Sequence, residues 1–256
     1  MTDCSDLHAL IASASGLEEG AEVAGALREA LLELIARRRR PEEPPIPALS
    51  ALVVRREGLP EWWGRANLLL TASGVAPNLT TEHRPLERAG NLAILGAAAN
   101  VGRLSFAASD GLIVVGDGVS MMLANLSARN GGAILLGAGC TAKSWARVDA
   151  RNGGAVLVGE DGMWAPGVNL VTDDMHAICD LESGRRVNAY GGRIVVERHV
   201  WLCEEARLVG GARVGADSVV GFGALVRSTL PAGAVSVGAP ARAIRHGVTW
   251  AREDLP

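Results

Sequence analysis

The C-terminal part of the chain repeats with a period of six residues. An aliphatic side chain recurs at Val196, Leu202, Leu208, Val214, Val220 and Val226. Four residues after the first five of these come Val200, Ala206, Ala212, Ser218 and Ala224, all small except the valine. Such short repeats are typical of parallel β-helices, in which each hexad forms one flat face and one corner of a three-sided coil. We therefore expect coils stacked at strand spacing, about 4.8 Å.

A longer repeat precedes the hexads. The segment Ala128-Arg-Asn-Gly-Gly-Ala-Ile-Leu-Leu-Gly137 returns twenty-two positions later as Ala150-Arg-Asn-Gly-Gly-Ala-Val-Leu-Val-Gly159. A degenerate copy lies at 107–116, and a fourth ends at 190–197. Asn-Gly supplies the positive φ that a corner needs, and the aliphatic run that follows suits a buried strand. Each repeat is predicted to be an eighteen-residue coil with an extended corner.

Composition agrees with thin, repeated layers. The chain has 256 residues, 48% of them hydrophobic, with 32 Gly but only two Phe and one Tyr. The formal net charge of -3 offers no basic excess for nucleic acid or an anionic membrane surface. No stretch is long and apolar enough for membrane insertion. The four cysteines, of which Cys4 is the first, lack paired spacing, which favours reduced thiols in a cytoplasmic protein.

The N-terminal part is predicted to be a separate extension. Apolar residues recur at helical spacing from Leu17 to Arg40, which predicts one amphipathic helix, and a proline-rich linker follows at 41–47. Short strands are expected at 51–54 and 67–70. The predicted parts are a helical extension and linker (1–48), a short-strand region (49–91), the β-helix (92–240) and a C-terminal tail (241–256).

The repeat is interrupted once. Between Gly159 and Glu197 the offset is thirty-eight residues, which is one repeat of twenty-two plus sixteen more. The additional segment, at 173–188, is polar, fits no hexad and contains Asp174-Met-His176. Loops that project from a rigid repeat scaffold are common places for catalytic groups. This segment is therefore the predicted catalytic loop.

The residues around this loop resemble a known family, the hexapeptide-repeat acyltransferases that O-acetylate capsular and other cell-surface sugars. The matching stretches are 165–168, 174–178, 180–185, 199–202 and 238–242, and the resemblance extends over roughly residues 92–250. It implies an all-β fold, a left-handed parallel β-helix with a small helical N-terminal extension. It also implies a homotrimer that binds acetyl-CoA, the acyl donor, in a cleft between adjacent subunits.

Histidine is the natural general base for a sugar hydroxyl that attacks a thioester. His176 resembles the catalytic histidine of the family. Asp174 is expected either to orient its imidazole or to cap the loop. Trp201 resembles a family tryptophan near the catalytic histidine, and its indole N–H either binds acceptor or oxyanion or packs between subunits. His199 is expected to face solvent or a neighbouring coil.

For the donor, Gly221 and Gly223 would let the pantetheine arm approach the backbone, unless they only serve the hexads. Arg242 and Arg245 resemble basic positions that bind the CoA phosphates, and guanidinium suits phosphate; the alternative is ordinary surface charge. The family commonly has a lysine where this chain has Arg227, which offers a replacement charge. Cys203 stands at a usual glycine position, so covalent thiol catalysis is an alternative.

Three functions fit these features. The first is acetyl-CoA-dependent O-acetylation of a carbohydrate hydroxyl, on a cell-surface polysaccharide or its precursor. The second is N-acetylation of an amino sugar or small amine, and the third is a non-enzymatic β-helix scaffold. The acceptor, the length of the acyl group and the role of residues 1–90 stay open at this point.

Overall fold

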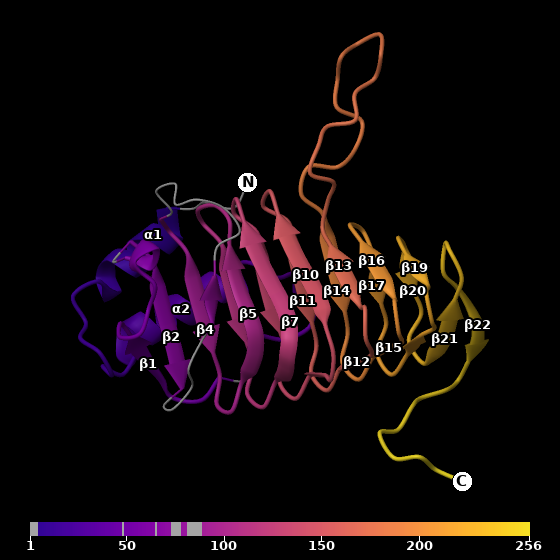
Figure 1. Cartoon of the computed structure of the whole chain (residues 1–256), viewed down its shortest axis with the longest axis horizontal. Helices are drawn as coiled ribbons and strands as arrows, with labels where there is room; N and C mark the ends of the chain where they lie inside the picture. Colours follow the sequence, from indigo (N-terminus) through magenta and orange to yellow (C-terminus); the bar gives the residue numbers. More distant parts are fainter. Residues whose placement is uncertain (1–4, 48, 65, 73–77, 81–88) are drawn as a thin grey trace.

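The computed structural model describes residues 5–47, 49–64, 66–72, 78–80 and 89–256, so Cys4 lies outside the described residues. The main body is a left-handed parallel β-helix of about seven coils, which confirms the expected fold class (Figure 1). Each complete coil contributes one strand to each of three faces. The corners between the faces carry the positive-φ positions that the repeats predicted, including Asn130 and Asn152.

Two sheets make up the three faces. The first has nine strands in the order β1 (Leu52–Arg55), β2 (Leu68–Ala72), β4 (Leu92–Leu95), β6 (Leu112–Val115), β8 (Ala133–Leu136), β11 (Ala155–Val158), β14 (Arg193–Val196), β17 (Arg213–Val214) and β20 (Thr229–Leu230). Every neighbouring pair from β2 to β20 is parallel. This sheet is one face of the prism.

The second sheet covers the other two faces because β7 turns a corner and belongs to both. Its main path runs through β19 (Leu225–Val226), β16 (Arg207–Val209), β13 (Asn169–Val171), β10 (Ala146–Arg151), β7 (Ser120–Arg129), β9 (Thr141–Ala142), β12 (Met163–Trp164), β15 (Trp201–Leu202), β18 (Val219–Val220), β21 (Ala234–Val237) and β22 (Arg242–His246). Two further strands, β3 (Leu79–Thr80) and β5 (Asn100–Phe106), join it beside β7.

The aliphatic and small positions of the hexads point into the prism. The six aliphatic residues from Val196 to Val226 are at most 1% exposed, and the small residues between them are at most 2% exposed. The narrow interior is therefore filled as the six-residue period predicted. Some other coils depart from the pattern: the indole of Trp164, for example, lies in this core above the small residue Ala142 of the preceding coil.

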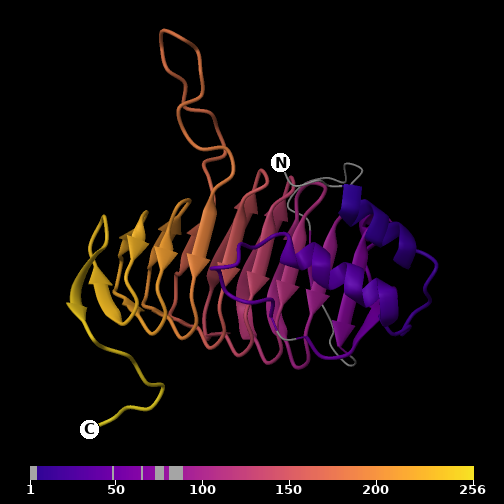
Figure 2. The same ribbon diagram turned by 180° about the vertical axis from the view of Figure 1, so that it is seen from behind.

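The helical extension covers the outer face of the nine-stranded sheet. Helices α1 (Ser5–Ala14) and α2 (Gly25–Ala36) lie across it (Figure 2). Leu31 and Ile35 of α2 share a buried cluster with outward-facing strand residues such as Ile94 and Val114. Strands buried on both faces need apolar residues at every position, which explains continuous runs such as 112–115 and 133–136. A short 3₁₀ turn, Glu61–Trp63, lies between β1 and β2.

The sequence prediction of one helix from Leu17 to Arg40 was wrong at its start. Residues 17–24 form turns and a bridge, and the preceding helix α1 was missed. The backbone N–H of Val23 donates to Leu52, and Gly20 has a φ of +75°. Pairing with β1 therefore replaces helical hydrogen bonds there. The strands expected at 51–54 and 67–70 are confirmed as β1 and β2, and β2 already pairs in parallel with β4.

One antiparallel pair lies at each end of the β-helix. β1 pairs antiparallel with β2, and residues 20–23 exchange backbone hydrogen bonds with its free edge. At the other end β22 pairs antiparallel with β21. From residue 247 the C-terminal tail runs back along the prism (Figure 1). Within the described residues, neither helix has the length and apolar character needed to cross a membrane.

Candidate active site

The inserted segment is a long loop at the corner between β13 and β14. It leaves the prism after Val171, returns at Arg193 and projects far beyond the other corners (Figures 1 and 2). Residues 174–185 are all exposed, and the imidazole of His176 is among them. Among the described residues the His176 ring makes no hydrogen bond or ion pair. The predicted base is thus freely accessible on a single chain.

Asp173 fastens the two ends of the loop together. Its Oδ2 accepts hydrogen bonds from the backbone N–H of Gly191 at 2.7 Å and from Nδ2 of Asn152 at 2.9 Å. Arg151 donates through Nη1 to the Asp173 carbonyl at 3.3 Å. Asp173 is 9% exposed. The two ends of the loop are therefore held in fixed positions where the loop leaves the β-helix.

Asn188 fixes the backbone around His176. Its Nδ2 donates to the His176 carbonyl oxygen and to Oδ2 of Asp174, both at 3.0 Å, and its Oδ1 accepts from the Ile178 N–H at 2.8 Å. Asp174 is thus bonded to Asn188, and no hydrogen bond joins its carboxylate to the His176 ring in the described chain. This geometry agrees with the capping alternative for Asp174.

A buried ion cluster lies in the coils below the loop. The carboxylate of Asp149, fully buried, accepts from Nη2 of Arg151 at 2.5 Å and Nη2 of Arg147 at 2.8 Å, with Nη2 of Arg129 at 3.4 Å. Burial opposes its ionisation, but the Arg151 hydrogen bond and the charges of Arg129 and Arg151 outweigh burial and lower the pKa of Asp149. Arg151 also donates a hydrogen bond to the Asp173 carbonyl, so this cluster supports the point where the loop leaves the β-helix.

Trp201 lies on the opposite side of the prism from the loop. It belongs to β15, on the face between the two corners that do not carry the loop. It is partly exposed, and its ring lies 6.3 Å from that of Trp250 between centroids. His176 and Trp201 of one chain are therefore separated by the thickness of the β-helix.

A hollow of about 820 Å³ lies beside Trp201. Residues that line it include Met122, Lys143, Met163 and Arg252. Arg252 comes from the C-terminal tail and donates to Oδ1 of Asp161 at 2.7 Å and to Oγ1 of Thr141 at 3.0 Å. Sequence reasoning did not single out this hollow, although Lys143, the only lysine of the chain, was a visible signal.

His199 holds the C-terminal tail to the coils. Its Nδ1 lies 2.6 Å from Oδ2 of Asp161 on the neighbouring coil, and its Nε2 lies 3.0 Å from the Trp250 carbonyl. The imidazole stacks on the Trp250 ring, with 4.2 Å between centroids. His199 therefore contacts a neighbouring coil, one of the two expected surroundings. The tail contact through Trp250 was not anticipated.

The expected donor residues gather at the C-terminal coils. Gly223 has a φ of +63° with open space where a side chain would stand, whereas a Cβ at Gly221 would lie 2.7 Å from the Val237 side chain. Arg227, Arg242 and Arg245 are exposed. All three lie on coils that follow Trp201 along the prism. Arg227 lies between β19 and β20, at the corner that carries the loop, whereas Arg242 and Arg245 lie on β22 beside β21. Gly221 is thus explained by packing, and Gly223 leaves room for a ligand.

Cys203 is poorly suited to covalent catalysis. Burial raises the pKa of its thiol to about 11, so the nucleophilic thiolate is scarce near neutral pH. Cys140, Cys179 and Cys203 are all free thiols. Buried Cys140 has an even higher pKa, about 12.

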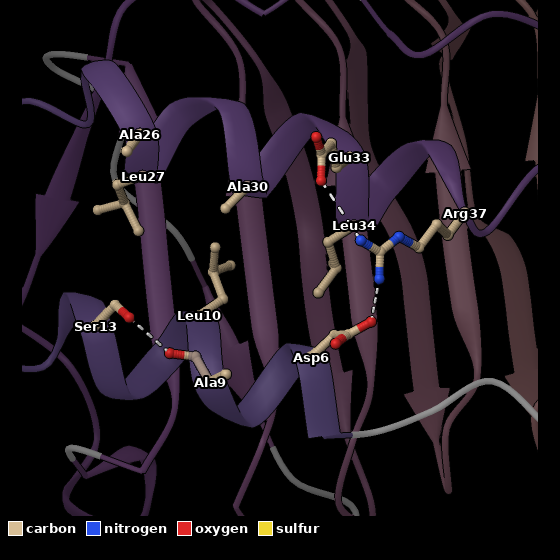
Figure 3. Close-up of a pocket in the computed structure, with 10 residues that line it drawn as sticks. All are labelled: Asp6, Ala9, Leu10, Ser13, Ala26, Leu27, Ala30, Glu33, Leu34 and Arg37. Carbon is tan, nitrogen blue, oxygen red and sulfur yellow. Dashed lines mark hydrogen bonds and ion pairs between the residues drawn. The ribbon is translucent and has the colours of Figure 1, made fainter.

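A second hollow, of about 360 Å³, lies between the two helices (Figure 3). Alanines line much of it, and Arg37 closes one end through ion pairs with Asp6 and Glu33. It contains none of the predicted site residues.

Comparison with known proteins shows similarity to sugar O-acetyltransferases. No family model matches it. It is 31% identical over 96 residues to a polysialic acid O-acetyltransferase of Escherichia coli O1:K1, covering 38% of this chain and 31% of that protein. It is 32% identical over 82 residues to a galactoside O-acetyltransferase of Lactococcus lactis, covering 32% and 39% respectively. The resemblance inferred from the motifs is confirmed.

A solved structure supports the fold over a longer span. The polysialic acid-specific acetyltransferase NeuO superposes with a TM-score of 0.61 at 23% identity, over 74% of this chain and 86% of that one. At this identity the match shows the fold alone. The sequence matches span between three and four tenths of the curated relatives.

Proposed function

We propose that this protein is an acyltransferase that moves an acetyl group from acetyl-CoA to a carbohydrate hydroxyl. The observation that carries the proposal is the exposed imidazole of His176 on a braced loop, in a β-helix similar to sugar O-acetyltransferases. A base for this reaction must reach the hydroxyl proton directly. An unpartnered ring on a projecting loop meets that requirement.

The reaction needs no covalent enzyme intermediate. His176 takes the hydroxyl proton while the sugar oxygen attacks the thioester carbonyl, which forms the new C–O bond and a tetrahedral oxyanion. The C–S bond then breaks, and the imidazolium returns the proton to the CoA sulfur. Histidine suits both steps because its charge changes near neutral pH. The indole N–H of Trp201 is a suitable donor to the oxyanion or acceptor.

A site that contains both His176 and Trp201 requires two copies of the chain, since each copy holds them on opposite sides of the prism. The loop also exposes Met175, Ile178, Leu181, Val187 and Tyr190, and exposed apolar side chains gathered on one element favour burial against a partner. A head-to-tail ring places the loop of each copy on the Trp201 face of the next. We propose the homotrimer that the resemblance implies.

Acetyl-CoA fits the coils that follow Trp201. Gly223 leaves open space at a corner, and Arg242 and Arg245 offer exposed guanidinium groups for phosphates. Arg227, at the loop corner, would contribute its exposed guanidinium group from the adjacent copy. Arg242 donates to the adjacent Ala241 carbonyl, and the other two arginines form no ion pair within the described chain. Acetyl-CoA would supply the thioester, with the CoA thiolate as a good leaving group. The intracellular location inferred from the cysteines stays a prediction.

The proposal is tested by incubating the protein with acetyl-CoA and a panel of sugars and amino sugars while following thiol release. His176→Ala should lower turnover by about 10²–10⁴-fold, whereas His8→Ala, a histidine replacement on α1, should not. A product that alkali hydrolyses indicates an ester, and an alkali-stable product indicates N-acetylation. Unchanged turnover in His176→Ala would exclude His176 as the general base. The absence of transfer to any acceptor would favour the non-enzymatic scaffold.

The assembly is tested by complementation. His176→Ala and Trp201→Ala are each expected to be nearly inactive, but mixed and refolded together they should regain activity, because some interfaces then pair an intact histidine with an intact tryptophan. Sedimentation should give a mass of three chains. A fully active monomer would contradict the proposed interface.

A further inference from the structure

The hollow beside Trp201 is formed by two columns of side chains. Along β7, β9, β12 and β15 the strand register aligns Ser120, Thr141, Met163 and Trp201, while the alternate residues of these strands are buried. The second column contains Met122, Lys143 and Ala165, and Pro166 and Arg252 complete the wall. The volume of about 820 Å³ is in the range of small-molecule sites.

Lys143 gives this hollow its charge. Arg252, the other cation in the wall, is paired with Asp161 at 2.7 Å. Lys143 is exposed and makes no ion pair or hydrogen bond with any residue that the structure describes. No carboxylate is among the lining residues. An uncompensated ammonium group therefore faces an apolar and aromatic floor, in a chain whose net charge is -3.

We propose that this hollow is the acceptor subsite and that Lys143 selects sugars that carry a carboxylate. The inference rests on the proposed function, in which CoA occupies the coils on the other side of Trp201. An acceptor must then reach Trp201 from the hollow. Met163 and Trp201 offer an apolar surface for the C–H face of a sugar ring, and the ammonium offers a point charge for its carboxylate.

The spacing suits one acidic sugar unit. Lys143 directly follows β9, and β9 lies two coils before β15 in the stack. Two coils span about 10 Å along the prism at ordinary strand spacing. The flexible lysine side chain can extend over part of that distance. A sugar whose carboxylate pairs with the Lys143 ammonium group would then have a ring hydroxyl beside Trp201. A neutral sugar would meet the same floor without the ionic contact.

The first experiment compares sugars that differ only at C6, where the acid has a carboxylate in place of the hydroxymethyl group: galacturonic acid against galactose and glucuronic acid against glucose. Wild type should favour the acids in kcat/KM by about tenfold or more, the worth of one charged hydrogen bond. Lys143→Gln should reduce that ratio to near one, mainly through KM, and Lys143→Arg should keep a preference. The matched control Arg103→Gln removes an exposed positive charge outside the hollow and should leave the ratio as in wild type.

The second experiment measures binding without transfer. Because Lys143 is the only lysine, an amine-reactive reagent can modify only this side chain and the terminal amine. Galacturonic acid should slow Lys143 modification, measured by peptide mass spectrometry, and galactose should slow it much less. Absence of transfer to every sugar would reject the proposed function while this measurement still decides the subsite. Equal protection by both sugars, or none, overturns the role of Lys143, as does an acid preference that persists in Lys143→Gln.

Discussion

Nδ2 of Asn188 donates a hydrogen bond to the carbonyl oxygen of His176 at 3.0 Å. The same amide group also bonds Asp174 and the backbone N–H of Ile178. One side chain thus connects the outgoing and returning segments of the loop next to His176, the proposed general base. Loops usually obtain such precision from their scaffold, but here much of it comes from within the loop.

Asn188→Ala should therefore lower kcat without abolishing binding of the donor. With the three hydrogen bonds gone, His176 samples more positions, and a loss of about tenfold to a hundredfold in kcat is expected from misplacement. The KM for acetyl-CoA should change little, because its proposed contacts lie on other coils. Ser183→Ala, which removes a hydroxyl bonded to Asp180 in the same loop, is the control. Equal kcat losses in the two variants would contradict the positioning role.

Asp173→Ala should loosen the loop at its base. The N–H of Gly191 and the amide of Asn152 lose their acceptor. Trypsin should then cut after Arg185 or Arg186 several times faster, because local opening exposes the chain to proteolysis. Cleavage rates followed by mass spectrometry, with Asp180→Ala compared in parallel, test this. If Asp173→Ala is cut at the wild-type rate, Asp173 does not hold the two ends of the loop together.

Protonation of Asp149 should lower the stability of the protein as the pH falls. Its pKa is lowered in the folded chain, so its ionised form stabilises the protein above its unfolded pKa, about 3.9, and this contribution is lost as pH falls through the folded pKa. Asp149→Asn leaves buried guanidinium groups unneutralised, at a cost of about 3–5 kcal/mol. Urea unfolding followed by circular dichroism at pH 7 and at pH 3 measures both effects. The gap between wild type and variant should shrink at the lower pH.

Cys203→Ala should retain most of the transfer activity. Burial raises the pKa of the thiol to about 11, and direct attack by the sugar uses no sulfur nucleophile. Acetyl-CoA assays of the purified variant, together with mass spectrometry of wild type held with acetyl-CoA alone, test this. An acetylated Cys203 peptide that turns over with acceptor would reinstate the covalent route.

Leu31→Ala on α2 should destabilise the N-terminal part. Leu31 is 1% exposed between the helix and the nine-stranded sheet, and truncation of a buried leucine costs about 2–5 kcal/mol. Thermal unfolding with an apolar dye should show an earlier transition and more exposed apolar surface. Leu255→Ala, at an exposed residue of the tail, provides the comparison. An unchanged transition would mean that the helices do not support the sheet.

The interior of the β-helix could be predicted because it depends on local periodicity. Residues such as Leu202 and Ala206 alternate in size for a steric reason that acts within each coil. The loop position followed from the same arithmetic, since an insertion breaks a period visibly. The helix boundaries could not be found this way, because Val23 pairs with Leu52 across 29 positions and tertiary contacts overrode the helical pattern.

The site was predictable only in part. His176 could be chosen by its place in the insertion, but the partners of Asn188 and Asp173 depend on how the loop and coils fold. Lys143 gains its proposed role only because residues of several coils form the hollow around it. Asn152, for example, was recognised as a corner residue, whereas its bond to Asp173 depends on how two coils stack. The separation of His176 from Trp201 also needs the three-dimensional path of the chain. Spacing of 25 residues gives no sign of it.

The antiparallel pairs at both ends of the prism determine how far the hydrogen-bonded ladder can grow. A parallel β-helix with open ends would present rows of unpaired backbone groups to other molecules, the usual starting point for aggregation into fibres. Residues 20–23 occupy the edge of β1, and β22 ends the other sheet with Arg242, Arg245 and His246 along an exposed strand. The addition of further strands at the edges of β1 and β21 is thereby opposed.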